Sequence, residues 1–455
     1  MKADVARLTP VAGRAEAPQD APVDKVAGAA AASPTGQGIG GAAAASLAGQ
    51  GVGGTDSGSG SSGDFGPVGN LAERWRDWVQ RCVCSPGFRQ WAAGFWFTRP
   101  LVRRRAAQLF DLVAGFVYTQ VLLACVRLDL FERLAQGGAQ TAAQLAQRHA
   151  LPLRSMQRLL DAAVSLRLLA RRRGGRYALG ALGAPMVGNG ALAAMVEHHA
   201  ALYADLRDPV ALLREEGAGS AMSAYWPYAA YPEADALPAH AVAAYSALMT
   251  ASQPMVIDEV LAAYPLQRHR CLLDIGGGEG RFVAAAAAHA PALRCLLFDL
   301  PPVAALARHR LAGLQLSQRV QVHGGSFFDD ALPTGADIVT LLRVLFDHDD
   351  AHALAILRAA HAALPPGGTL LVAEPMAQAD GAAAMGDAYF GFYLLAMGRG
   401  QPRSAADLTA LLQQAGFTAV RALRTRLPLQ TGVLTARAGP AVQTPMTRVN
   451  DQRQP

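Results

Sequence analysis

Residues 271–280 read Cys-Leu-Leu-Asp-Ile-Gly-Gly-Gly-Glu-Gly, an apolar run that leads into a glycine-rich loop. A second apolar run, residues 296–300, contains Asp299 near its end. An apolar strand followed by a glycine loop, and then a strand that ends in an acid, is typical of α/β sheets that bind a nucleoside. The pattern therefore predicts a nucleoside-containing ligand at the ends of these two strands.

The spacing within the loop narrows the type of ligand. The glycines of residues 276–280 fit G-x-G-x-G, but the third glycine of the dinucleotide fingerprint would fall on Arg281. The loop has neither a phosphate-binding lysine nor a serine nucleophile. Asp274 and Asp299 instead suit a ligand with an ammonium group and ribose hydroxyls. S-adenosylmethionine is such a ligand, although glycines alone also fit a purely structural turn.

Composition sets the broad class of the protein. The chain has 455 residues, 51% of them hydrophobic, which predicts a globular protein of two or three domains. The net charge of +6 permits contact with acidic membranes or nucleic acid and requires neither. The five cysteines are odd in number and lack the C-x-x-C spacing, which favours a reducing cytoplasm without disulfides.

Targeting and membrane-spanning segments are not expected. Residues 1–20 contain charges and no continuous apolar run, so they do not resemble a signal peptide. Near residue 120 the longest uncharged stretch, residues 112–126, is shorter than the roughly 20 residues that span a bilayer. We therefore expect a soluble or peripheral protein.

Composition and periodicity divide the chain into six segments. We expect a disordered extension at 1–70, a Trp/Arg-rich amphipathic segment at 71–100, a winged-helix domain at 101–185, a helical connector at 186–262, a ligand-binding α/β domain at 263–438, and a disordered tail at 439–455. In the α/β domain, strands are predicted at 271–275, 294–299, 319–323, 336–342, 368–374 and 431–437. Alternation of these strands with helices predicts a Rossmann-like, mainly parallel sheet with helices on both faces.

The two segments before the connector each allow two interpretations. In residues 71–100, tryptophans and phenylalanines alternate with arginines, which suits either a membrane interface or packing onto the next domain. In residues 101–185, a long apolar helix at 109–130, a short helix capped by Thr141, a helix at 152–169 and a hairpin at 171–179 predict a winged helix. The presumed DNA-recognition helix has few basic or amide side chains, so dimerisation is favoured over DNA binding.

Several motifs together resemble one known family. They are residues 273–280 (Leu-Asp-Ile-Gly-Gly-Gly-Glu-Gly), 298–301 (Phe-Asp-Leu-Pro), 324–328 (Gly-Gly-Ser-Phe-Phe), 342–350 (Leu-Arg-Val-Leu-Phe-Asp-His-Asp-Asp) and 415–417 (Ala-Gly-Phe). Over residues 105–438 the chain resembles S-adenosylmethionine-dependent O-methyltransferases that carry a winged-helix dimerisation domain. The resemblance implies a homodimer.

Residues 88–130, especially 98–100 and 109–117, are similar to the bacterial carotenoid branch of this family. That branch methylates the tertiary 1-hydroxyl of acyclic carotenoids such as hydroxyneurosporene and demethylspheroidene. The resemblance therefore implies carotenoid biosynthesis in a photosynthetic bacterium. It also implies a cytoplasmic location, with peripheral contact to the inner membrane and no nucleic-acid partner.

The resemblance also assigns cofactor residues. The predicted contacts are Asp274, Gly276, Gly278, Asp299, Ser326, Phe327 and Arg343. By similarity, Gly276 approaches the methionine part of the cofactor and Asp299 binds the ribose hydroxyls. Ser326 and Phe327 stand where the family usually has Asp-Met beside the adenine, which removes one acceptor for the adenine amino group. Arg343 occupies a position that bacterial members often fill with arginine.

The catalytic positions depart from the family pattern. Plant members use a histidine as general base, supported by two glutamates, and here the histidine position is Phe346 and one glutamate position is Pro402. Glu374 matches the other glutamate. His348 becomes the predicted base, although it also suits a helix-capping role. The i, i+4 pair of His348 and His352 lacks a third ligand, so we expect no metal.

A long apolar pocket is predicted for the substrate. The helix expected at 386–398 and the connector supply its predicted lining residues, Met249, Tyr389, Tyr393 and Met397, although such residues also suit a plain core. Three alternatives to the carotenoid enzyme stay open. They are a phenolic or polyketide O-methyltransferase, a methyltransferase acting on a bacteriochlorophyll precursor, and a non-enzymatic regulator that senses the cofactor.

Overall fold

The structure is a computed structural model that describes residues 67–225, 253–379, 381, 383–428 and 431–440. The chain divides into two compact units, Met1–Gln90 and Trp91–Pro455. Most of the predicted extension (1–66) and of the predicted tail (441–455) lies outside the described residues. Connector residues 226–252, with the predicted pocket residue Met249, also lie outside them.

The Trp/Arg-rich segment is helical. Helix α1 (Pro67–Cys84) lies in the first unit, and α2 (Pro86–Gly94) begins there and ends in the second. On α1 the rings of Trp75 and Trp78 stack with centroids 5.0 Å apart, and both side chains are at least half exposed. In the second unit Trp91 stacks on Phe95, with centroids 5.1 Å apart. Several aromatic side chains of this segment therefore contact one another while staying exposed.

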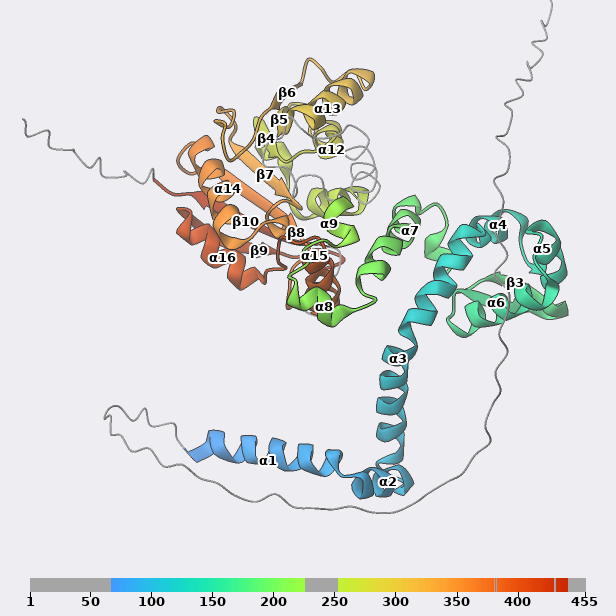
Figure 1. Ribbon diagram of the computed structural model, residues 1–455. Helices are drawn as coiled ribbons and strands as arrows, with labels where there is room; N and C mark the ends of the chain where they lie inside the picture. Colours follow the sequence, from blue (N-terminus) through green and yellow to red (C-terminus); the bar gives the residue numbers. More distant parts are fainter. Residues whose placement is uncertain (1–66, 226–252, 380, 382, 429–430, 441–455) are drawn as a thin grey trace, which may run out of the picture. The chain divides into compact units, whose positions relative to one another are not determined.

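A helical region with a small sheet follows. Its elements are α3 (Arg99–Arg127), α4 (Leu130–Gly137), β1 (Gln140–Thr141), α5 (Ala142–Arg148), α6 (Leu153–Ser165), β2 (Leu169–Arg172) and β3 (Arg176–Leu179). The sheet has the order β1-β3-β2, and β2 and β3 form the predicted antiparallel hairpin (Figure 1). Thr141 caps α5 as predicted, since its hydroxyl accepts a hydrogen bond from the backbone N–H of Gln144.

Helix α3 is longer than predicted. It begins at Arg99, ten residues before the predicted start, and is 29 residues long. Within the described ranges it is the one helix long and apolar enough to cross a membrane, and 11% of its most apolar window is buried. The fifteen-residue length argument against a span therefore does not hold, because it counted only the uncharged part of the helix.

The connector is helical where it is described. It contains α7 (Gly190–Asp205), α8 (Pro209–Arg214), α9 (Ala221–Tyr225) and a helix over residues 253–263. Helix α15 (Gly391–Ala396), from the α/β domain, contacts α7, α8 and α9. This packing brings the connector to the part of the α/β domain that follows β8.

The α/β domain contains a seven-stranded sheet with the order β6-β5-β4-β7-β8-β10-β9. Its strands are β4 (Cys271–Ile275), β5 (Arg294–Asp299), β6 (Val320–Gly324), β7 (Ile338–Leu342), β8 (Thr369–Glu374), β9 (Phe417–Leu423) and β10 (Gly432–Ala438). The first five are parallel, whereas β10 is antiparallel to both β8 and β9. The predicted mainly parallel α/β fold is confirmed.

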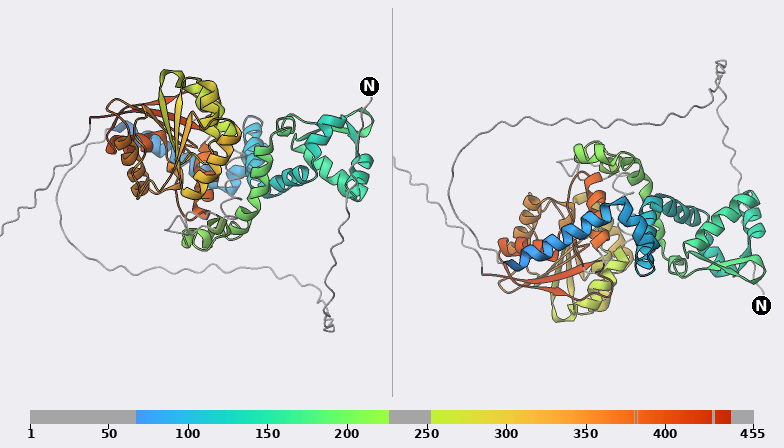
Figure 2. Two further views of the ribbon diagram at one scale, coloured as in Figure 1. Left: turned by 90° about the horizontal axis from the view of Figure 1, so that it is seen from above. Right: turned by 90° about the horizontal axis from the view of Figure 1, so that it is seen from below.

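Helices cover both faces of this sheet. Apolar side chains of α12 (Arg281–His289) and α13 (Pro301–Gly313) pack on one face, and those of α14 (Asp350–Ala363) and α16 (Ala405–Gln414) pack on the other. Figures 1 and 2 show the two pairs of helices on opposite sides of the strands. The loops that follow the parallel strands therefore lie together at the carboxyl ends of those strands.

The sequence predictions for this domain were incomplete in two places. Strand β9 was missed because it is an edge strand with only Phe417 fully buried, so it lacks a continuous apolar run. The helix predicted at 386–398 is present as a π-helix, η6 (Ala384–Phe390), followed directly by α15. Apolar periodicity indicates a helix there but does not distinguish an i→i+5 hydrogen-bond pattern from an i→i+4 pattern.

Candidate active site

The glycine loop after β4 adopts backbone angles that side chains disfavour. Gly276, Gly278 and Gly280 have φ values of +66°, +57° and +79°. A Cβ added to Gly276 would lie 2.8 Å from Cγ2 of Val344, in the loop after β7. The loop after β4 therefore packs closely against the loop after β7, and its glycines have no side chain that would fill this space.

Asp299 links this loop to the end of β5. Its carboxylate accepts a hydrogen bond from Gly278 N at 2.7 Å through Oδ2, and one from Leu300 N at 2.8 Å through Oδ1. Burial raises the pKa of Asp299 to about 6, against the effect of these two hydrogen bonds. Asp299 is thus fixed beside Gly278, and its contact with a ribose stays a prediction.

Asp274 lies deeper in the sheet than Asp299. Its side chain is buried, and Oδ1 accepts a hydrogen bond from the Thr340 hydroxyl at 2.7 Å. Burial, with a smaller contribution from the Asp299 carboxylate, raises the pKa of Asp274 to about 7. The carboxyl group therefore connects β4 to β7, and its contact with the cofactor ammonium stays a prediction.

A residue that the sequence did not indicate completes this side of the site. The Gln253 Oε1 atom is buried and has no hydrogen-bond partner within the described residues. Gln253 Nε2 is 3.6 Å from the position that a Cβ on Gly278 would take, and nothing else lies within 4 Å of that position. An unpaired acceptor beside the glycine loop and a fixed carboxylate fits a ligand with ammonium and hydroxyl donors, as S-adenosylmethionine has.

The predicted adenine side is aromatic. Ser326 Oγ accepts a hydrogen bond from Phe328 N at 3.2 Å, while Ser326 N donates to Asp330. The Phe327 ring lies perpendicular to the rings of Phe328 and His348, with centroid distances of 4.7 and 5.7 Å. Ser326 and Phe327 therefore lie together after β6, as predicted, and present an apolar surface beside one hydroxyl.

His348 is part of this aromatic cluster. Besides Phe327, its ring lies perpendicular to that of Phe328 at 5.6 Å. Burial, and to a smaller extent the neighbouring His352, lower the pKa of His348 to about 4. His352 contacts the Asp349 carboxylate, which caps α14. The structure places His348 beside the predicted adenine contacts, and its role as base stays a prediction.

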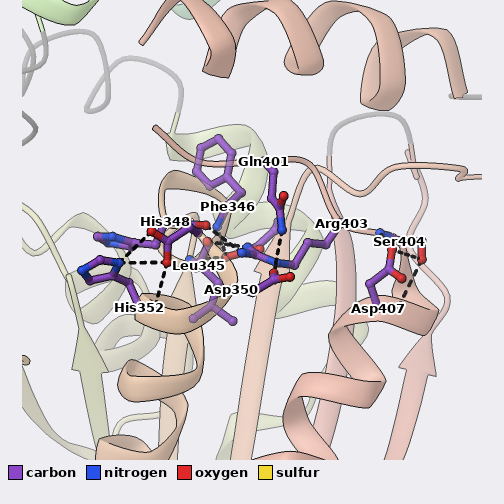
Figure 3. Close-up of polar contacts among 11 residues, drawn as sticks. Leu345, Phe346, His348, Asp350, His352, Gln401, Arg403, Ser404 and Asp407 are labelled. Atoms are coloured by element: carbon purple, nitrogen blue, oxygen red, sulfur yellow. Dashed lines mark hydrogen bonds and ion pairs between the residues drawn. The ribbon is translucent and has the colours of Figure 1, made fainter. Parts of the chain in front are cut away.

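Two buried side chains hold the loop after β7. Glu374 Oε1 accepts hydrogen bonds from Leu345 N at 2.6 Å and Phe346 N at 3.2 Å, and burial raises its pKa to about 7. Arg403 donates to the carbonyl oxygens of Leu345 and His348, both at 2.7 Å. Figure 3 shows Arg403 within this loop and the Phe346 ring directed away from it.

Arg403 also forms an ion pair with Asp350 at 2.8 Å. Arg403 lies directly after Pro402, the position where the family has its second glutamate. The sequence alone did not indicate a role for Arg403. Glu374, predicted to be catalytic, has one carboxylate oxygen engaged by the backbone of this loop. The two residues therefore fix the conformation of the loop that carries Phe346.

Arg343 and Asp347 are two ionisable residues of the same loop. Arg343 has φ +59°, and its N–H donates to Ala373 O at 2.9 Å. Asp347 is buried, its Oδ1 has no hydrogen-bond partner within the described residues, and burial raises its pKa although the charge of Arg343 opposes this. The Arg343 charge also acts on Tyr389, where burial raises the pKa to about 12.

The predicted pocket residues that are described belong to one apolar cluster. Tyr389, Tyr393 and Met397 pack with Phe346 and with leucines of α7 and α8. His198 and His199 of α7 bind the hydroxyls of Tyr393 and Tyr389 respectively. These two histidines lie in the predicted connector, 190 or more residues from their partners, and local motifs do not indicate that they come together.

Comparison with known proteins identifies the family. Residues 203–418 match the model of the O-methyltransferase domain, and residues 110–189 match that of the O-methyltransferase dimerisation domain. The chain is 42% identical, over 75% of its length and 89% of the relative's, to demethylspheroidene O-methyltransferase of Cereibacter sphaeroides. The chain belongs to the S-adenosylmethionine-dependent O-methyltransferase family.

Other members of the family agree with this. The demethylspheroidene O-methyltransferase of Rhodobacter capsulatus is 40% identical over 74% of this chain and 84% of the relative. Among solved structures, the S-adenosylmethionine-dependent methyltransferase SibL has a TM-score of 0.62 and 26% identity, covering 73% of this chain and 99% of SibL. This chain is therefore an S-adenosylmethionine-dependent O-methyltransferase, and the predicted cofactor is confirmed.

Metal ligation has no support in the part of the chain that is described. No group of three or more histidine, cysteine, aspartate and glutamate side chains lies close enough to hold a metal ion there. His352, the second histidine of the i, i+4 pair, is engaged by Asp349.

Proposed function

We propose that this enzyme methylates the tertiary 1-hydroxyl of an acyclic carotenoid of the hydroxyneurosporene or demethylspheroidene type. The observation that carries the proposal is the identity of 40–42% to two demethylspheroidene O-methyltransferases, over 84–89% of their lengths. Relatives named for other substrates, such as acetylserotonin O-methyltransferase of Mus musculus, are 31% identical over 73% of this chain and 89% of the relative.

The residues of the acceptor side suit such an alcohol. When bound, S-adenosylmethionine supplies a methyl group on a sulfonium, which is already a good leaving group. The protein has to align the hydroxyl, exclude water and accept a proton as the new C–O bond forms. A tertiary alcohol is far less acidic than a phenol, so a histidine at position 346 would not deprotonate it in advance. The apolar Phe346 and its cluster favour alignment and dehydration instead.

The test is a direct assay of the purified protein. S-adenosylmethionine and a 1-hydroxy acyclic carotenoid in detergent are incubated with the enzyme, and the product is analysed by mass spectrometry and absorbance. We expect one added methyl group with an unchanged chromophore. Absence of product, with cofactor binding confirmed by calorimetry, would contradict the proposal and direct the search to tetrapyrrole and phenolic acceptors.

We also infer that the enzyme is a homodimer on the cytoplasmic face of the photosynthetic inner membrane. Support for the dimer comes from the match of residues 110–189 to the dimerisation domain and from the apolar side chains that α3 exposes. Support for membrane contact comes from the exposed Trp75, Trp78 and Trp96 between arginines, a composition that suits the headgroup region.

Vesicle flotation tests the membrane contact. Wild type and a variant with Trp75, Trp78 and Trp96 changed to serine are mixed with vesicles of phosphatidylglycerol and phosphatidylcholine. We expect the variant to float several-fold less while binding S-adenosylmethionine normally. Equal flotation of the two proteins would contradict peripheral binding through this segment, and light scattering of the same samples reports the oligomeric state.

A further inference from the structure

Two histidine–tyrosine pairs join the connector to the helices after β8. His199 Nε2 lies 2.8 Å from the Tyr389 hydroxyl, and His198 Nε2 lies 3.0 Å from the Tyr393 hydroxyl. The histidines are consecutive on α7, and the tyrosines are one helical turn apart on η6 and α15. All four polar groups sit within or beside the apolar cluster that contains Phe346.

The His199–Tyr389 pair lies near the position that the family uses for its base. The Phe346 ring is perpendicular to that of Phe390 at 6.1 Å, and the Phe390 ring is 5.0 Å from that of Tyr389. Tyr389 is also close enough to Arg343, at the carboxyl end of β7, for that charge to affect its pKa. One aromatic ring therefore separates Tyr389 from the position that lacks the histidine.

The backbone that carries Tyr389 is unusual. η6 is a π-helix, a form that is rare and often found at functional sites. Its Gly386 packs against the Met376 carbonyl so closely that a Cβ has no room. This contact holds η6 against the segment that follows β8 and Glu374. Tyr389 therefore meets His199 on an element whose packing depends on a glycine.

The two pairs differ in accessibility and surroundings. Tyr393 is buried, whereas Tyr389 and His199 are only half-buried. Burial lowers the pKa of both histidines, that of His198 to about 4, so both imidazoles are neutral at pH 7. A neutral imidazole whose Nε2 faces a tyrosine hydroxyl is a hydrogen-bond acceptor in the Nδ1–H tautomer. The more accessible pair is the one suited to a transferred proton.

We propose that Tyr389 and His199 form a proton relay that takes the role of the base missing at Phe346. This proposal rests on the proposed alcohol methylation. As the alcohol oxygen bonds to the methyl carbon and the sulfur–carbon bond breaks, the alcohol proton passes to the Tyr389 oxygen. The tyrosine's own proton passes to His199 Nε2. The positive charge lost from the sulfonium ends on the imidazolium, so the total charge of the site is unchanged.

The neighbours of His199 suit this role. On its own helix it is next to His198, and the Glu197 of that helix is paired with Arg127 of α3. On the facing helices it meets Tyr389, whereas Tyr393, one turn on, is the partner of His198. Beyond Tyr389 lies the Arg343 cation. Loss of the sulfonium charge during the reaction makes protonation of His199 more favourable at the moment the proton arrives.

Steady-state kinetics with matched variants tests the relay. Tyr389→Phe and His199→Asn remove the transferable protons, and we expect each to lower kcat about 100-fold, a usual contribution of a general base. Calorimetric affinity for S-adenosylmethionine and the unfolding midpoint should stay close to wild type. His198→Asn, which removes the equivalent histidine of the other pair, should change kcat by less than about threefold.

A pH profile and the variant His348→Ala distinguish the relay from a base at His348. The acid limb of kcat should fall with an apparent pKa below 6.5 in wild type and disappear in His199→Asn, because only the neutral imidazole accepts a proton. A loss of kcat in His348→Ala with full activity in His199→Asn would overturn the relay and favour His348. Equal losses in His199→Asn and His198→Asn would also overturn it, because they indicate that the pairs only hold α7 in place.

A titration independent of turnover separates the relay from the proposed substrate. The histidine carbon signals are followed by NMR against pH, with His199→Asn identifying the His199 peak. We expect a lower His199 pKa with S-adenosylmethionine than with S-adenosylhomocysteine, since the first carries the sulfonium charge. The same pKa in both complexes would overturn the relay. A pKa difference in a protein that makes no methylated carotenoid would retain the relay and overturn only the substrate.

Discussion

The loops after β4 and β7 lie side by side at the carboxyl ends of these strands and contact each other through Gly276 and Val344. The loop after β4 keeps the family pattern and holds its shape through glycines and Asp299. The loop after β7 has lost the family histidine at Phe346 and holds its shape through buried Glu374 and Arg403. In this chain the loop predicted to bind the cofactor is therefore shaped mainly by backbone geometry, whereas the loop that carries Phe346 is shaped by buried side chains.

Of the variants that test these two loops, Arg403→Met should have the largest effect on stability. In Arg403→Met the His348 carbonyl loses its donor, at a cost of about 1–3 kcal/mol. The Leu345 carbonyl keeps the hydrogen bond from His348 N but loses one from a charged group, which contributes about 1.5–3 kcal/mol. We expect the free energy of unfolding to fall by about 4 kcal/mol, measured by urea denaturation. Arg421→Met, at an exposed arginine of β9, is the control and should change stability by less than about 0.5 kcal/mol. Equal effects of the two variants would mean that Arg403 does not hold the loop.

The pattern of strands and glycines was enough to predict the sheet and the cofactor end. Buried parallel strands appear in the sequence as continuous apolar runs. Glycines directly after such a strand indicate backbone positions with positive φ. The edge strand β9 was missed because most of its side chains are exposed and only Phe417 is fully buried. The local sequence determines the predicted elements, whereas β9 depends on its pairing with β10.

Glu374→Gln tests the second buried side chain of the loop after β7. The folded pKa of about 7 lies above the ordinary value of 4.5, so the folded chain holds this proton more tightly than the unfolded chain. The stability that this contributes is fully present below pH 4.5 and is lost as the pH rises to 7. The difference amounts to about 3 kcal/mol.

Glutamine cannot ionise but can accept the same backbone hydrogen bonds. Between pH 5 and pH 8 we therefore expect the cofactor-free wild type to lose about 2–3 kcal/mol more stability than Glu374→Gln. Urea denaturation at the two pH values measures this. The other buried acids, including Asp274 and Asp347, remain in both proteins and cancel in the comparison. Parallel pH profiles for the two proteins would show that Glu374 is not the group that titrates.

Asp299→Ala tests the cofactor end. The change removes an acceptor that fixes Gly278 N and Leu300 N and that is predicted to bind ribose hydroxyls. Hydrogen bonds to charged groups contribute about 1.5–3 kcal/mol, so we expect about a 100-fold loss of affinity for S-adenosylmethionine in calorimetry. Asp299→Asn retains one acceptor oxygen and should lose less. Unchanged affinity in the alanine variant would show that the family's ribose contact is made elsewhere in this chain.

The acceptor end required the structure because its parts are far apart in the sequence. Tyr389 and His199 are 190 residues apart and come together only when α7 packs near the π-helix. Gln253 and Arg403 carry no motif and become notable through burial and hydrogen bonding. His348 was assigned by its closeness to Phe346 in sequence, yet its ring contacts Phe327 and Phe328. Adjacency along a loop does not determine which side of the loop a side chain takes.

Two glycine substitutions give the smallest expected effects and separate stability from binding within the loop after β4. Gly276→Ala and Gly278→Ala both force alanine into positive φ, at a cost of about 1–2 kcal/mol. Gly276→Ala also pushes on Val344, whereas a methyl group on Gly278 meets only Gln253 at 3.6 Å. We expect Gly276→Ala to lose more stability and Gly278→Ala to lose more cofactor affinity relative to its loss of stability. Urea denaturation and calorimetry on both variants measure the two effects. The reverse pattern would mean that the cofactor lies against Gly276 and Val344, and that the loop after β7 shapes the cofactor site as well as the acceptor site.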